Sequence, residues 1–315
     1  MKATFIRGLK QGLHVAWTLS KVIFPITVIV TILQYTPILP WLIEAISPVM
    51  GIFGLSGEVA VPLVLGNSLN LYAGIAAIVS FEFTVKEVFI MAVMLSFSHN
   101  LFVESTVALK VGVRWPIVIG VRVALACISA LLIHLIWSGG EEVAQYGFIQ
   151  STQASPSGVV EIGIEGVRTA TSSIFQLGAI VIPLMVIMQY FRELGWMTKI
   201  SSLLSPFTRL LGIKSNASMT LVAGLSIGLA FGAGVMVQAV REDGVAKKDM
   251  YLSFIFLVAC HAVIEDTLIF IPLGIPVWPL LIIRLTTAII LTATIAFLWN
   301  KAEIKQRREQ INYGN

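Results

Sequence analysis

Two clusters of ionisable residues lie inside apolar stretches of the sequence, where charged groups are costly and usually serve a function. The first cluster contains His99 and Glu104, and the second contains His261, Glu265 and Asp266. A histidine beside a carboxylate can relay protons near neutral pH. His261 and Glu265 are four residues apart, so a continuous helix would place them on one face. A buried network that only stabilises packing is the alternative reading of both clusters.

Neutral polar residues form a second group, in the glycine-rich segments 58–80 and 217–239. Asn67, Ser68 and Asn70 offer neutral donors and acceptors, which suit an uncharged or zwitterionic polar ligand. Glycines four residues apart also allow close helix packing. The predicted solute-binding set combines both groups: Gly66, Asn67, Ser68, Asn70, His99, Asn100, Glu104, Gly224, Ser226, His261, Glu265, Asp266 and Thr267.

Imidazole and carboxylate groups together can also bind a divalent metal ion. The candidate metal ligands are His99, Glu104, His261, Glu265 and Asp266. No HExxH motif is present, so an enzyme is not expected and no catalytic residue is predicted. No cofactor is expected, and a coupling proton or cation is left open.

The elements that position these residues must be membrane helices. Hydrophobic residues make up 57% of the 315 residues, charged residues make up 12%, and the mean hydropathy is +0.90. Several apolar stretches contain the roughly 20 residues that a helix needs to cross a bilayer. Basic residues lie between these stretches and near both ends of the sequence, where they set topology. Nucleic acid is therefore not an expected partner, whereas the lipid bilayer is.

The sequence repeats internally. At an offset of 158 residues, Pro25 matches Pro183 and Gly66 matches Gly224. After an insertion near 241–248 the offset becomes 162. It then matches His99 with His261, Gly112 with Gly274, Arg122 with Arg284, and Trp137 with Trp299. Matches of Pro, Gly, His, Arg and Trp at a nearly constant offset indicate duplication. We therefore predict a first repeat over 1–138, an extracytoplasmic linker over 139–170 and a second repeat over 171–315.

Each half contains the same predicted elements in the same order. The first half has apolar helices at 12–36, 87–110 and 115–138, a short amphipathic helix at 38–54 and the glycine-rich segment 58–80. The second half has them at 171–191, 249–271 and 277–299, with 196–212 and 217–239 between the first two.

Basic residues assign the sides of the membrane. If both ends of each glycine-rich segment lie on the same side of the membrane, sixteen basic residues fall on one side. The linker 139–170, on the other side, is acidic. By the positive-inside rule the N- and C-termini are cytoplasmic. Each glycine-rich segment is then a re-entrant hairpin, each half crosses three times, and the two repeats are inverted. Inverted repeats with re-entrant segments are typical of secondary transporters.

The glycine-rich segments and the Ser-Pro helices before them resemble the nucleoside-recognition, or Gate, domain family. The resembling stretches read ISPVMGIFGLSGEVAVPLVLGNSLNLYAG and LSPFTRLLGIKSNASMTLVAGLSIGLAFGAG. Similar gates occur in concentrative nucleoside transporters and in ferrous iron transporter B. The resemblance implies re-entrant gates with Gly66, Asn67, Ser68, Gly224 and Ser226 beside a solute path. No GxxxxGK[ST] motif accompanies them, unlike in a complete ferrous iron transporter B.

The sequence thus predicts an all-α integral membrane protein with two inverted-topology repeats. Each repeat has three transmembrane helices, an amphipathic helix and a re-entrant Gly-rich hairpin. The function we predict is a secondary permease of the cell membrane for a small polar, nucleoside-like solute, by alternating access between inverted repeats. Alternatives are a divalent metal ion permease and a non-transporting membrane scaffold or assembly factor. Whether the chain forms a homo-oligomer is left open.

Overall fold

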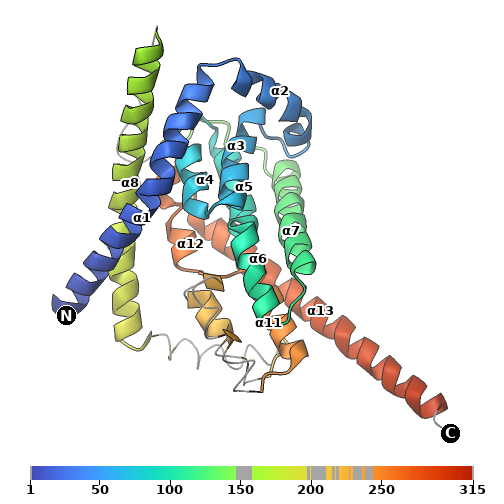
Figure 1. Ribbon diagram of the computed structural model, residues 1–315. Helices are drawn as coiled ribbons and strands as arrows, with labels where there is room; N and C mark the ends of the chain where they lie inside the picture. The colour runs from blue at the N-terminus through green and yellow to red at the C-terminus, as the bar shows by residue number, and fades with distance from the viewer. Residues whose placement is uncertain are drawn as a thin grey trace. The chain divides into compact units, whose positions relative to one another are not determined.

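The computed structural model is helical (Figure 1). It describes residues 2–146, 158–196, 199, 211–214, 217, 220–226, 228–229, 236–237 and 244–313. Within these residues the only strand-like pairing is an isolated bridge between Thr84 and Val143. The predicted all-α fold is therefore confirmed.

The helices follow the predicted order along the chain. Those before the linker are α1 (Lys2–Gln34), α2 (Ile38–Gly51), η1 (Gly57–Val59), α3 (Ala60–Ser68), α4 (Leu71–Ile78), α5 (Val85–Ser98), α6 (Leu101–Lys110) and α7 (Trp115–Ile136). Those after it are α8 (Val159–Glu193), α11 (Lys247–Ala259), α12 (Glu265–Leu268), η3 (Ile271–Leu273) and α13 (Val277–Tyr313).

Several of these helices are long and apolar enough to cross a membrane. Three stretches qualify individually, namely Val85–Lys110, Trp115–Ile136 and Val277–Ile304. A fourth span is formed if Thr27–Leu33 and Ile38–Gly51, which are bent by 90° at a short break, count as one. The prediction of an integral membrane protein with several apolar helices agrees with this finding.

The chain divides into two compact units, which we describe separately. Unit 1 contains residues 1–102, 122–196 and 264–281, and unit 2 contains residues 103–121, 197–263 and 282–315. Each unit therefore includes segments from before and after the linker. The units are not the sequence repeats, whose boundaries stay a prediction.

In unit 1 the two longest helices, α1 and α8, lie side by side (Figure 1). Glycine allows their backbones to approach closely. A Cβ atom built on Gly8 would lie 2.7 Å from Val186 Cα, and one built on Gly12 would lie 2.9 Å from Ile182 Cα. Small residues at such positions are typical of helix pairs in membranes, where close packing is the main source of association.

The first glycine-rich segment folds into a helical hairpin of α3 and α4. A Cβ atom built on Gly74 would lie 3.0 Å from Gly66 Cα and 3.2 Å from the carbonyl oxygen of Pro62. A continuous helix would separate Gly66 and Gly74 by about 12 Å along its axis, so the chain must turn back between them. Each arm has fewer than ten residues, whereas a bilayer crossing needs about 20.

Each unit is organised around one helix that is buried on nearly all sides. In unit 1 this is α5, whose residues from Val88 to Ser98 are all buried. In unit 2 it is α11, where burial is continuous from Leu252 to Ala259. A helix that is apolar all round is the expected centre of a membrane protein core. The two central helices begin 162 residues apart, at the offset of the sequence repeat.

The prediction of two continuous apolar helices is wrong, because the structure interrupts both of them. The predicted helix 87–110 is interrupted at His99 and Asn100, between α5 and α6. The predicted helix 249–271 stops at Ala259, and α12 begins only at Glu265. The structure also starts α8 at Val159, inside the predicted linker 139–170. The predicted helix 196–212 and much of the segment 217–239 lie outside the described residues.

The hairpin contact generates a first prediction. Gly74→Ala should lower the free energy of unfolding by about 1–3 kcal/mol, the usual cost of overpacking, because its Cβ would meet backbone atoms of α3. Gly120→Ala in α7 is the matched control, since a Cβ there has no atom within 4 Å and alanine favours a helix by up to about 1 kcal/mol. Thermal unfolding in detergent measures both, and equal melting temperatures would contradict the close contact.

A second prediction concerns the end of the α1–α8 pair, where Glu193 accepts hydrogen bonds from Arg7, Thr4 and Gln189. The bond from Arg7 is the largest cause that lowers the Glu193 pKa from 4.5 to about 2. A carboxylate with a lowered pKa stabilises the fold above its unfolded pKa. This stabilisation should therefore be complete above about pH 4.5 and disappear as the pH falls toward 2.

Glu193→Gln tests this prediction, because it removes the charge and keeps the shape of the side chain. Melting temperatures recorded between pH 7 and the acid limit of the detergent should fall less steeply in the variant than in the parent chain. Identical pH profiles would show that the Arg7–Glu193 contact does not contribute to stability.

Candidate functional site

The candidate site of unit 1 is built around the break after α5. His99 is the C-cap of α5, and Asn100 adopts a left-handed backbone conformation with φ 52°. The N–H group of Asn100 donates a hydrogen bond of 2.9 Å to the carbonyl oxygen of Gly66. The break therefore pairs with the α3 arm of the hairpin, and the strained conformation marks a position set by tertiary contacts.

A buried arginine stabilises the broken end of α5. Arg122 is completely buried, and its guanidinium donates to the carbonyl oxygens of Phe97 at 2.7 Å and of His99 at 2.5 Å. The last carbonyl groups of a helix have no partner within the helix. A cation at that end also interacts favourably with the helix dipole. Arg122 supplies both the donors and the charge.

The same local arrangement recurs in unit 2 around the end of α11. Arg284 is completely buried and donates to the carbonyl oxygen of His261 at 2.6 Å. Ala262, the residue after the histidine, has φ 42° and donates to the carbonyl oxygen of Gly224 at 3.0 Å. Gly224 also packs tightly, since a Cβ there would lie 2.4 Å from Leu257 Cδ1. The sequence offsets relate these residues to their counterparts in unit 1: Arg284 to Arg122, His261 to His99, and Gly224 to Gly66.

Each histidine faces a buried carboxylate in its own unit. In unit 1, His99 Nε2 lies 3.9 Å from an oxygen of Asp266. In unit 2, His261 Nε2 lies 3.3 Å from an oxygen of Glu104. All four side chains are at least nine-tenths buried. We call these two contacts the His–carboxylate pairs.

The His–carboxylate pairs join the two halves of the sequence reciprocally. Glu104 and Asp266 are themselves 162 residues apart, as are His99 and His261. Each histidine therefore contacts the carboxylate that belongs to the other half of the chain. The spacing within one half does not predict this exchange, because it arises only from tertiary packing.

The i, i+4 interpretation of His261 and Glu265 is wrong. His261 follows the end of α11, whereas Glu265 begins α12, and the two residues belong to different units. Glu265 instead accepts a hydrogen bond of 2.5 Å from the hydroxyl of Tyr72 on α4. Sequence reasoning missed Tyr72, although a phenol in a segment of small aliphatic residues was a signal that could have found it.

The predicted hairpin residues have different environments. Asn67 lies near the end of α3, and its side-chain oxygen is buried without a hydrogen-bond partner among the described residues. Ser68 is the last residue of α3. Asn70 is the N-cap of α4, and its side chain accepts from the N–H group of Ala73 at 3.0 Å. Asn67 is therefore the better candidate for ligand contact, while Asn70 has a structural role.

Unit 1 thus brings together nine of the predicted residues and unit 2 the other four. Those in unit 1 are Gly66, Asn67, Ser68, Asn70, His99, Asn100, Glu265, Asp266 and Thr267, and those in unit 2 are Glu104, Gly224, Ser226 and His261. Ser226 and Thr267 are both buried. The predicted set is therefore divided between the two units.

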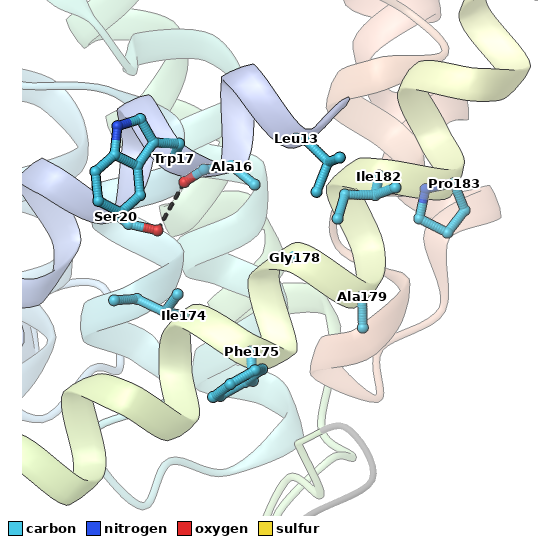
Figure 2. Close-up of a pocket in the computed structure, with 10 residues that line it drawn as sticks. All are labelled: Leu13, Ala16, Trp17, Ser20, Ile174, Phe175, Gly178, Ala179, Ile182 and Pro183. Atoms are coloured by element: carbon cyan, nitrogen blue, oxygen red, sulfur yellow. Dashed lines mark hydrogen bonds between the residues drawn. The ribbon is translucent and has the colours of Figure 1, made fainter. Parts of the chain in front are cut away.

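A groove of about 610 Å³ also lies between α1 and α8 in unit 1 (Figure 2). Its walls are apolar, and none of the ten lining residues is titratable: Leu13, Ala16, Trp17, Ser20, Ile174, Phe175, Gly178, Ala179, Ile182 and Pro183. The Ser20 hydroxyl donates to the carbonyl oxygen of Ala16 at 2.7 Å, as the dashed line shows. The groove therefore offers little to bind a polar solute.

Comparison with known families identifies the family of this chain. The family model described as Gate, nucleoside recognition, matches residues 16–115 and 174–276. The chain belongs to the Gate family. The two matched stretches contain the two histidines, and each includes one glycine-rich segment. The resemblance found in the sequence is therefore confirmed.

A similar protein comes from Bacillus subtilis (strain 168) and is described as the uncharacterized membrane protein YvoD. It is 61% identical over 301 residues, which cover 96% of each chain. No solved structure matches this chain. The present protein is thus a membrane protein with Gate segments, and its relative's description specifies no solute.

The arginine contacts generate a third prediction. Arg122→Leu should lower the free energy of unfolding by at least about 2 kcal/mol, because a hydrogen bond to a charged group contributes roughly 1.5–3 kcal/mol and two carbonyl groups lose their donor. The free energy of unfolding of Arg122→Lys should lie between those of Arg122→Leu and the parent chain, since an ammonium group lacks the planar fork of guanidinium.

Arg168→Leu is the control for this prediction. Arg168 is exposed and lies 3.8 Å from Glu165 on the same helix, and such surface pairs contribute about 0–1 kcal/mol. Thermal unfolding in detergent compares the variants. Equal shifts for Arg122→Leu and Arg168→Leu would contradict the proposed role of Arg122.

Proposed function

We propose that this Gate protein is a secondary permease for a small polar, nucleoside-like solute, which it moves by alternating access between inverted repeats. One observation carries the proposal: the side-chain oxygen of Asn67 is buried without a hydrogen-bond partner among the described residues, and it lies beside a helix break that the hairpin contacts. Solute sites in secondary transporters are formed by discontinuous helices of this kind.

The hairpin supports a re-entrant gate. Its arms, α3 and α4, are each too short to cross a bilayer, and the positive-inside rule favours both its ends lying on one side. Backbone that is irregular at membrane depth is tolerated only where it is buried in protein or lines a cavity. The break between Ser68 and Leu71 satisfies that condition if it lies beside a solute path.

The chemistry of unit 1 suits a neutral polar solute. Asn67 offers an amide oxygen, and the hydroxyl of Thr267 is buried without a partner among the described residues. Both groups can accept a hydrogen bond, as the hydroxyl and amino groups of a nucleoside-like solute would require. Glu265, held by Tyr72, is a further acceptor in the same unit.

The reciprocal His–carboxylate pairs supply a physical link between the two halves. Because each pair joins a histidine of one half to a carboxylate of the other, a change at one pair acts on both halves of the sequence. Alternating access requires a coupling of this kind.

The proposal includes a membrane placement and a set of partners. The chain is a multi-pass protein of the cell membrane with both termini in the cytoplasm, as the distribution of basic residues indicates. Its partners are the solute and the bilayer, and a second copy of the chain is left open. It needs no catalytic residue and no cofactor beyond a coupling proton or cation.

Asn67→Ala and Asn70→Ala together test the solute site. A solute that binds the folded chain raises its melting temperature by mass action. Asn67→Ala should abolish the response to the solute that a panel of nucleosides and other polar solutes identifies. Asn70→Ala should lower the basal stability by roughly 1 kcal/mol, the usual value of a helix cap, and keep the response.

Three outcomes of the panel separate the candidate functions. A response lost only in Asn67→Ala supports the polar-solute permease. A response to divalent cations alone favours the metal permease, which the His–carboxylate pairs make the second candidate. No response to either, with a lower melting temperature in His261→Ala, would reject transport and favour a scaffold.

A further inference from the structure

The apolar groove of unit 1 lies between α1 and α8, the first helices of the two predicted repeats (Figure 2). Residues related by the offset of 158 line it from both sides, since Trp17 matches Phe175 and Ser20 matches Gly178. The two aromatic side chains are 64% and 71% exposed. The groove thus has a small residue and an exposed aromatic side chain on each helix, and an occupant contacts both halves of the sequence.

The size and the lining of the groove suit an acyl chain. Its volume of about 610 Å³ lies within the range of about 300–1,000 Å³ that ligand pockets span. The one hydroxyl in the lining, that of Ser20, already donates to the carbonyl oxygen of Ala16. An acyl chain needs no hydrogen bond, so it fills such a groove without leaving a polar group unsatisfied.

Lys21 places a positive charge beside this groove. Its Nζ atom lies 5.5 Å from the centroid of the Trp17 ring, which is part of the lining, and a cation over an aromatic face is attracted to it. Lys21 lies within the predicted apolar helix 12–36, where a charge is costly and is normally paired. Among the described residues, Trp17 is the only interaction partner of this ammonium. The ring carries no net charge, so the ammonium still needs a counterion.

The surrounding helices do not supply a carboxylate at the groove. Neither α1 nor the stretch 171–191 of α8 contains an aspartate or a glutamate. A second copy of the chain would not supply one either, because a two-fold contact brings the same surface against itself. Lysine would then face lysine across the contact. Charge complementarity therefore favours an anionic lipid over a second copy.

We propose that the groove binds one anionic phospholipid, with an acyl chain between α1 and α8 and the phosphate group at the ammonium of Lys21. Lysine binds phosphate as a point charge, and its long apolar stem lets the ammonium extend along the protein surface toward a headgroup. The site shares no residue with the predicted solute-binding set. The inference therefore goes beyond the proposed function and does not depend on it.

The experiment titrates the full chain in detergent with dioleoyl phosphatidylglycerol or with dioleoyl phosphatidylcholine and counts the bound lipids by native mass spectrometry. The two lipids have the same acyl chains and differ in net charge. We expect one phosphatidylglycerol per chain, bound more tightly than phosphatidylcholine. Lys21→Gln should weaken phosphatidylglycerol binding by about fivefold, the factor expected for one basic residue near an anionic lipid, and leave phosphatidylcholine binding unchanged.

Lys110→Gln is the matched control for the charge. Lys110 is exposed at the end of α6, away from the lining of the groove, so its substitution should leave the affinity for both lipids at the parent value.

Gly178→Leu tests the groove itself. A Cβ atom at Gly178 has only Ile182 Cδ1 near it, at 4.0 Å, so the leucine side chain can enter the groove without meeting backbone atoms. This variant should lose the bound-lipid peak for both lipids. Gly163→Leu on the same helix is its control, because a Cβ there has no atom within 4 Å, and it should keep both peaks.

The proposal is overturned if the parent chain binds the two lipids equally, or if Lys21→Gln keeps the preference for phosphatidylglycerol. Retained lipid binding in Gly178→Leu would also overturn it. A parent chain that is dimeric, and that Gly178→Leu makes monomeric, would assign the groove to a second copy and overturn the lipid site.

Discussion

A helix that ends inside a low-dielectric interior leaves carbonyl groups without donors, and the rest of this structure depends on how that problem is solved. Both central helices end within the protein core, α5 with His99 as its C-cap and α11 with Cys260, the residue before His261. Arg122 and Arg284 donate to the carbonyl groups at these breaks. Because the broken ends have donors, the chain can change direction there and place polar side chains where a continuous helix would not.

The glycine-rich segments complete each break. Asn100 donates to Gly66 in unit 1, and Ala262 donates to Gly224 in unit 2. The absence of a side chain at these glycines is also necessary, because Leu95 and Leu257 occupy the space that a Cβ atom would need. The glycines thus have a packing role that is compatible with a gating role, and the two interpretations of the sequence do not compete.

The reciprocal pairing of histidine and carboxylate distinguishes this protein from a simple tandem duplication. If the halves were independent, His99 would contact a carboxylate of its own half, and each half could fold alone. Instead each histidine faces a residue from the other half, so the polar chemistry requires both copies. The asymmetry between the units is equally informative, since only unit 1 has the additional Tyr72–Glu265 contact.

The sequence by itself determined the class of protein, the repeat offsets and the residue types of the site. Composition and hydrophobic periodicity indicate whether a segment lies in lipid or in water. Matches of Pro, Gly, His and Arg at a constant offset indicate duplication. Only the tertiary structure decided that the helices break at His99 and His261, that Glu265 pairs with Tyr72, and that the carboxylates exchange between halves. Apolar periodicity continues through a break whose carbonyl groups are satisfied from elsewhere, so nothing local marks it. Contacts between residues more than 150 positions apart depend on packing that spacing along one helix does not record.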